Sequence, residues 1–188
     1  MADLSTTYMG LTLPSPLVLA SSSLTNKVEN FQAAEQHGAG AVVLRSLFEE
    51  QIEAVDSALQ DALARNAEIS AEAQSFFPRQ VIGPQEYLRL IGGAKKAVRI
   101  PVIASLNCVA PGSWSGYAKQ IEEAGADGLE VNLYGVQADP TISGAEVENR
   151  YHEIIAGIRD SVKIPMAVKL SPFFTALANT VSRFDATG

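Results

Sequence analysis

The chain has 188 residues, a formal net charge of −7, 47% hydrophobic residues and 19% charged residues. This balance excludes a disordered chain, and the acidic charge argues against a general nucleic-acid-binding protein, which would present a basic face. The single cysteine, Cys108, excludes a disulfide framework and a metal site built from several cysteines. No apolar run reaches the roughly 18 residues of a membrane span, and residues 1–15 lack the features of a secretory signal, so we expect a cytoplasmic protein that binds neither membranes nor nucleic acids.

Extended apolar runs alternate with amphipathic helical segments along the chain. Residues 6–13, with Gly10 between two extended pieces, predict a β-hairpin. Five near-continuous apolar runs follow, a pattern typical of parallel strands covered on both faces. These runs are 17–22, 41–47, 101–107, 128–134 and 165–170. Helical spacing of apolar residues predicts helices between them. These helices are 26–37, 84–98, 113–124 and 143–162, with a further helix beginning near Ala176.

Two internal repeats support this register. AEQHGAGAVVL (34–44) and EEAGADGLEV (122–131) each read as a helix end, a glycine turn and an apolar strand, and RFDATG (183–188) repeats the helix end and the turn. RIPVIASLN (99–107) and KIPMAVKLS (163–171) each place a basic residue and Ile-Pro before a strand, where proline is tolerated. Strands that alternate with helices indicate βαβ units in a parallel sheet.

The fold class that we expect is α/β, a (β/α)₈ TIM barrel of which 1–188 forms a single partial domain with about the first five βα units. Residues 1–16 would form an N-terminal hairpin, and the Ala/Glu-rich stretch 49–80 a helical insert after the second strand. A full barrel needs about 250 residues, and Gly188 falls at a turn that elsewhere launches a strand, so we expect a truncated barrel. The alternative is a complete five-stranded doubly wound domain.

Polar residues interrupt the apolar strands near their carboxyl ends, where function gathers in such barrels. They are Ser21, Ser22, Ser23, Arg45, Ser46, Asn107, Cys108, Glu130, Asn132, Lys169 and Ser171. Two cations and two amides at corresponding depths would create a polar mouth that could bind a polar, electron-rich ring. His152 and Glu153 begin like a zinc-protease motif, but Ala156 stands where its second histidine belongs, so we expect no metal site.

Four stretches of the sequence carry a family resemblance. LSTTYMGLTLPSPLVLASSSLT (4–25), AVVLRSLFEEQI (41–52), EVNLY (130–134) and VKLSPFF (168–174) together resemble the FMN-dependent dihydroorotate dehydrogenases. Within them, the chain is most similar to the bacterial dihydroorotate dehydrogenase-like proteins. The resemblance covers the whole chain and implies a TIM barrel that carries FMN. It also implies a flavin-dependent dehydrogenase of pyrimidine biosynthesis that oxidises a CH–CH bond of a dihydropyrimidine-like small molecule.

The resemblance also implies roles for particular residues. The residues that would contact the cofactor are Ala20, Ser21, Ser22, Arg45, Ser46, Asn107, Asn132 and Lys169. Two of them, Asn132 and Lys169, are the catalytic candidates. Asn132 matches an asparagine that contacts flavin or substrate, and Lys169 matches a lysine that reaches the N1/O2 edge of the flavin. A fixed cation there would stabilise the negative charge of the reduced ring.

The sequence also departs from the family pattern. Tyr134, Gly135 and Val136 stand where the family has its Cys or Ser base, and residues 73–80 lack the family's Asn-rich character. The strands that hold the flavin phosphate in this fold would lie beyond Gly188. We therefore expect the chain alone to be impaired or inactive, and to form a homo-oligomer. The alternatives are a non-catalytic half-barrel that self-associates and a flavin-free lyase that uses Lys169 as a Schiff-base nucleophile.

Overall fold

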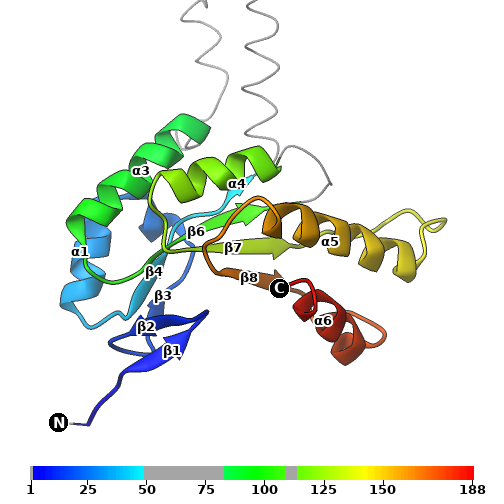
Figure 1. The fold of residues 1–188 in the computed structure, drawn as a ribbon, viewed down its shortest axis with the longest axis horizontal. Helices are drawn as coiled ribbons and strands as arrows, with labels where there is room; N and C mark the ends of the chain where they lie inside the picture. The colour runs from blue at the N-terminus through cyan, green and yellow to red at the C-terminus, as the bar shows by residue number, and fades with distance from the viewer. Residues whose placement is uncertain (1, 49–82, 109–113) are drawn as a thin grey trace, which may run out of the picture.

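The structure is a computed structural model, and it describes residues 2–48, 83–108 and 114–188. Its strands are β1 (Thr6–Tyr8), β2 (Leu11–Leu13), β3 (Val18–Leu19), β4 (Ala41–Val43), β5 (Leu47–Phe48), β6 (Val102–Asn107), β7 (Gly128–Leu133) and β8 (Met166–Leu170). Its helices are the short 3-10 helix η1 (Ser23–Asn26), α1 (Val28–Gln36), α3 (Pro84–Ala97), α4 (Trp114–Glu123), α5 (Gly144–Arg159) and α6 (Leu177–Asp185). The predicted order of strands and helices is confirmed (Figure 1). The insert predicted over 49–80 lies outside the described residues.

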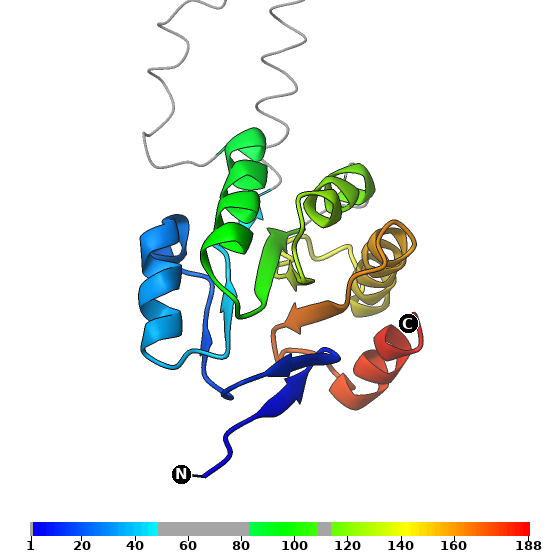
Figure 2. The ribbon, with the colours of Figure 1, turned by 60° about the vertical axis from the view of Figure 1, so that its left-hand side comes forward.

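The main sheet is parallel throughout and has the order β3-β4-β6-β7-β8, with β5 beside β6. The helices lie in an arc outside the strands, and the β1–β2 hairpin lies on the inner side (Figure 2). One apolar core joins side chains of α1, α3, α4, α5 and α6 to the outward-facing residues of the strands. Helices on one side of a curved parallel sheet are typical of a barrel, whereas a doubly wound domain carries helices on both faces. The expected partial (β/α)₈ barrel is therefore confirmed.

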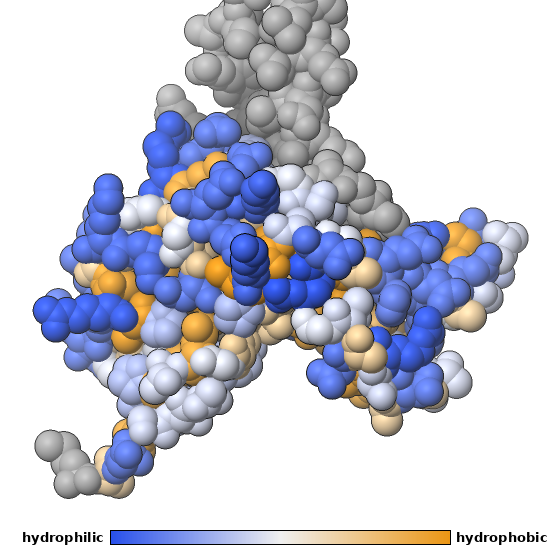
Figure 3. Space-filling view, in the orientation of Figure 1, coloured by the Kyte–Doolittle hydropathy of each residue, from blue (hydrophilic) through white to orange (hydrophobic). Residues whose placement is uncertain are grey.

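Alternate residues of each strand face the inside of the partial barrel. On β6, Val102, Ala104 and Leu106 belong to the outer core, whereas Ile103 packs with the hairpin residue Leu13. The hairpin thus closes the inner space at the amino ends of the strands. Gly128 makes room for it, because a Cβ at this position would lie 3.1 Å from Cε of Met9. The outer surfaces of the helices are mostly hydrophilic, with scattered apolar residues (Figure 3).

A β-bulge divides the second predicted strand, 41–47, into β4 and β5. Val43 pairs with Ile103, whereas Leu47 pairs with Leu106, so four residue steps on one strand match three on its neighbour. The extra residue shifts the alternation of inner and outer faces. As a result, Ser46 shares the inner side with Ser105, and the two hydroxyl oxygens lie 2.8 Å apart.

The two sequence repeats have the same structure. Glu35 accepts hydrogen bonds from the backbone N–H groups of Arg99 and Ile100, at 2.7 and 3.1 Å. Glu122, at the matching place in the second repeat, accepts from Lys163 N and Ile164 N at 2.8 and 3.0 Å. Each glutamate therefore fixes the Ile-Pro segment that leads into a strand.

The glycine turns of the repeats are also alike. Gly38 and Gly125 end α1 and α4 with φ values of 89° and 97°, which favour glycine. Gly188 has a φ of 102° and donates to Asp185 O, as Gly38 and Gly125 donate to Glu35 O and Glu122 O.

In the described parts of the chain, no helix combines the length and apolar character that a membrane crossing requires.

Candidate functional site

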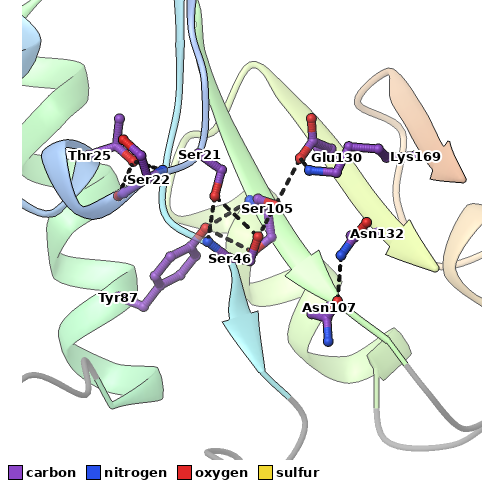
Figure 4. A network of polar contacts seen from close by, with 10 residues as sticks. All are labelled: Ser21, Ser22, Thr25, Ser46, Tyr87, Ser105, Asn107, Glu130, Asn132 and Lys169. Atoms are coloured by element: carbon purple, nitrogen blue, oxygen red, sulfur yellow. Dashed lines mark hydrogen bonds and ion pairs between the residues drawn. The ribbon is translucent and has the colours of Figure 1, made fainter. Parts of the chain in front are cut away.

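A row of polar side chains crosses the inner face of the sheet from the loop after β3 to β8 (Figure 4). Ser21 Oγ lies 3.2 Å from Ser46 Oγ, which lies 2.8 Å from Ser105 Oγ. Ser105 Oγ donates to Oε1 of Glu130 at 3.2 Å, and the same oxygen accepts from Nζ of Lys169 at 2.6 Å. We call these five residues the inner polar row. It links side chains that are up to 148 positions apart in sequence, counting from Ser21 to Lys169.

The strand register places the row on one face. Ser105 of β6 pairs with Glu130 of β7, and Asn107 pairs with Asn132 two residues nearer the carboxyl ends. Asn132 in turn pairs with Lys169 of β8. Since every second residue of a strand faces the same side, Glu130 and Asn132 both point inward, away from the outer core.

The bulge explains why hydroxyl groups cluster here. The backbone N–H of Ser46 donates to Ser21 Oγ at 2.9 Å instead of to a neighbouring strand. The backbone of Ser105 is satisfied by Tyr87 of α3, whose hydroxyl accepts from Ser105 N at 2.8 Å and donates to Ser105 O at 3.1 Å. Side-chain hydroxyls thus replace the ladder bonds that the bulge removes. Burial raises the pKa of the Tyr87 phenol well above its ordinary value, so this hydroxyl stays neutral.

Glu130 and Lys169 form an ion pair at the open end of the row. The Glu130 side chain is 15% exposed and that of Lys169 is 50% exposed. The carboxylate is therefore held within the protein, whereas the ammonium group reaches solvent. A half-exposed ammonium group can bind an anionic or electron-rich ligand at the carboxyl edge of the strands.

Two amides lie beside this pair. Asn132 Nδ2 donates to Asn107 Oδ1 at 2.5 Å. The remaining oxygen of Asn132 and the remaining nitrogen of Asn107 point away from this contact (Figure 4). The edge therefore offers a hydrogen-bond acceptor, a donor and a cation within a few residues, which suits the edge of a heterocyclic ring.

The structure brings together some of the predicted site residues and separates others. Ser21, Ser46 and Lys169 lie in the inner polar row, and Asn107 contacts Asn132. Ser22 instead caps η1, where its hydroxyl accepts from Leu24 N and its backbone N–H donates to Thr25 Oγ1. The other predicted positions lie apart from the row. Ala20 is exposed on the loop after β3, Arg45 is half-buried at the bulge, and Tyr134 and Gly135 are exposed after β7.

Sequence reasoning assigned no role at the site to Ser105 or Tyr87, and it gave Glu130 no role beyond a polar position. Strand alternation could have placed Glu130 at the site, because it lies two residues before Asn132 and therefore faces the same side of the sheet. Ser105 similarly lies two residues before Asn107 within an apolar strand. No comparable signal points to Tyr87, because its contact depends on how α3 packs on β6.

A separate hollow lies at the opposite, amino ends of the strands. It has a volume of about 570 Å³, and its lining includes Leu17, His37 and Arg99. None of the residues of the inner polar row lines it. The hollow and the row are therefore different places on the molecule, and only the row lies where barrels carry their chemistry.

No family model matches the chain. It is 26% identical over 181 residues to the catalytic subunit of dihydroorotate dehydrogenase B (NAD(+)) of Thermoplasma volcanium, with 92% of this chain and 55% of the relative covered. The same subunit of Thermoplasma acidophilum matches with the same identity and coverage. The chain thus spans about half the length of these curated relatives. The match supports a distant relationship to dihydroorotate dehydrogenases.

Solved structures of other enzymes share the fold. An IMP dehydrogenase/GMP reductase-like protein of Corynebacterium glutamicum has a TM-score of 0.55 at 15% identity, with 97% of this chain and 46% of that chain covered. A putative lyase/mutase of Burkholderia cenocepacia has a TM-score of 0.54 at 17% identity, with 92% and 56% covered. Phosphonopyruvate hydrolase has a TM-score of 0.52 at 12% identity, with 93% and 56% covered. These likenesses establish the barrel architecture, and together with the curated relatives they support an enzyme.

Proposed function

We propose that this chain carries the ring-contacting side of the FMN site of an oxidoreductase of the dihydroorotate dehydrogenase type. The observation that carries the proposal is the position of Lys169 and Asn132 on adjacent strands, facing inward at the carboxyl edge. The distant relationship to dihydroorotate dehydrogenases supports it. The substrate class that we propose is a dihydropyrimidine-like molecule, whose CH–CH bond would be oxidised.

The residues present fit FMN by their chemistry. Lys169 offers two further N–H donors for the electron-rich N1/O2 edge of an isoalloxazine ring, and Asn132 and Asn107 offer amide groups for its polar atoms. The hydroxyl of Ser21 would lie beside the ring from the loop after β3. When bound, FMN would supply the acceptor for a hydride.

The chain's own residues would bind and orient. Lys169 would stabilise negative charge at the ring edge through a fixed cation that need not reorganise. Asn132 would hold ring or substrate atoms through its amide. Glu130 accepts a hydrogen bond from Lys169 and would keep that side chain over the inner face. Tyr134 and Gly135 occupy the region of the family's base and offer no Cys or Ser, so we assign no residue to that role.

Titration of FMN fluorescence tests the proposal. We expect the wild-type chain to bind FMN weakly, through contacts to the ring alone, and Lys169→Ala to weaken that binding about tenfold, as the loss of one charge-assisted hydrogen bond predicts. Lys163→Ala is the matched control, because Lys163 is exposed at the opposite end of β8 and should leave binding unchanged. Equal affinities of all three proteins would refute the assignment of Lys169. Borohydride trapping of a carbonyl compound on Lys169 would instead favour the lyase alternative.

A further inference from the structure

Glu130 is fixed from two sides. Its Oε1 accepts from Lys169 Nζ at 2.6 Å and from Ser105 Oγ at 3.2 Å. Ser105 is itself held through Ser46, at 2.8 Å between hydroxyl oxygens. With only 15% of its side chain exposed, the carboxylate is the anchored member of the ion pair.

Lys169 depends on that anchor for its direction. The strand register places Lys169 opposite Asn132, and it places Ala167 opposite Glu130. The lysine side chain therefore turns diagonally across the sheet to reach Glu130, above a residue whose small side chain leaves room. Since Lys169 is 50% exposed and has a long, flexible side chain, little else in the described residues holds its ammonium group in place.

We propose that Glu130 is the positioning residue of Lys169, and that the Ser21–Ser46–Ser105 hydroxyls set the carboxylate for this purpose. The inference rests on the proposed function, in which Lys169 is the cation that meets the flavin ring. Glu130 itself contacts neither flavin nor substrate. Without it, Lys169 remains in the chain but spreads over many side-chain conformations, most of which point into solvent.

Amine acetylation followed by mass spectrometry tests the ion pair without any flavin. The probe is an N-hydroxysuccinimide ester of acetate, and the variants are Glu130→Ala and Glu130→Gln. Gln keeps an oxygen that can accept from Lys169 and Ser105, whereas Ala keeps none. Lys95 is an internal reference, because it forms a similar pair with Asp127 at 2.6 Å on the outer side of the sheet. The matched control variant is Glu123→Ala, at an exposed residue of α4.

We expect Glu130→Ala to speed acetylation of Lys169 about threefold to fivefold, the range that a half-exposed ion pair supports. Glu130→Gln should restore part of the protection, and Lys95 should react at the wild-type rate in every variant. A purely structural role would instead raise the reactivity of many lysines together and lower the melting temperature. Unchanged acetylation of Lys169 in Glu130→Ala would overturn the inference, even if the protein binds FMN.

FMN titration of the same samples separates this inference from the proposed function. Weaker binding in Glu130→Ala with partial recovery in Glu130→Gln supports both. Selective exposure of Lys169 in a protein whose wild type does not bind FMN refutes the proposed function, while the assignment of Glu130 as the residue that positions Lys169 stands.

Discussion

Replacement of Tyr87 by phenylalanine should destabilise the protein far more than the loss of one hydroxyl group usually does. Tyr87 is 1% exposed, and its hydroxyl both accepts from Ser105 N and donates to Ser105 O. Tyr87→Phe removes the hydroxyl and leaves the buried N–H and C=O groups of Ser105 without their hydrogen-bond partner. Each unsatisfied buried polar group costs about 1–3 kcal/mol, so the two groups together should lower the free energy of unfolding by about 2–6 kcal/mol.

Urea denaturation followed by circular dichroism measures this loss. Tyr117→Phe is the matched control, because Tyr117 is also buried and, among the described residues, its hydroxyl makes one hydrogen bond, to Pro84 O at 2.7 Å. It should cost less, about 1 kcal/mol. Tyr134→Phe, at a residue 57% exposed, should cost nothing measurable. Similar losses for Tyr87→Phe and Tyr134→Phe would refute the view that Tyr87 repairs the hydrogen bonding at the bulge.

Three further predictions follow from the helix ends and the sheet edges. Glu122→Ala should lower the free energy of unfolding by about 1–2 kcal/mol in urea, because two backbone N–H groups lose their acceptor, whereas Glu123→Ala should not. Hydrogen bonds from Ser143 lower the pKa of Glu146 below its ordinary 4.5, so its contribution to stability is present above that pH and is lost as the pH falls further. The free energy of unfolding in urea should therefore fall more steeply in wild type than in Glu146→Gln as the pH drops from 7 to below 4.5, and equal falls in the two proteins would contradict this role. In the described sheet, β3 and β8 are the end strands, and Val181 of α6 is 46% exposed, so light scattering should find dimers or larger species. A monomer at all concentrations would contradict that expectation.

The sequence predicted the architecture because periodicity and repeats report which face of an element is buried. Ser143 and Glu146 stand three residues apart, as in a capping box, and at the start of α5 Ser143 N donates to Glu146 Oε2 at 2.6 Å. The Ile-Pro repeats located the entries to β6 and β8. The sequence reveals such features because the contacts that form them join residues close in the chain, or because the same motif recurs at the same place before a strand.

The details of the site were less predictable because they depend on contacts between distant segments. AVVLRSL (41–47) reads as one apolar strand, and nothing within it marks the bulge that brings Ser46 beside Ser105. The pairing of Glu130 with Lys169 follows from the register of β7 and β8 and from the small side chain of Ala167. Ser22 was predicted to contact the cofactor, but it caps η1. A serine that follows a strand can cap a helix as readily as it can contact a ligand, and the sequence does not distinguish the two roles.

Amide chemical-shift mapping of the ¹⁵N-labelled chain during FMN addition tests the central claim most directly. The proposed site predicts that the largest shifts fall on Asn107, Asn132 and Lys169, with smaller shifts at Ser21 and Ser46. Residues lining the hollow at the amino ends, such as Leu17 and His37, should not shift. Shifts confined to that hollow, or no saturable shifts anywhere, would contradict a flavin site at the carboxyl edge of the sheet.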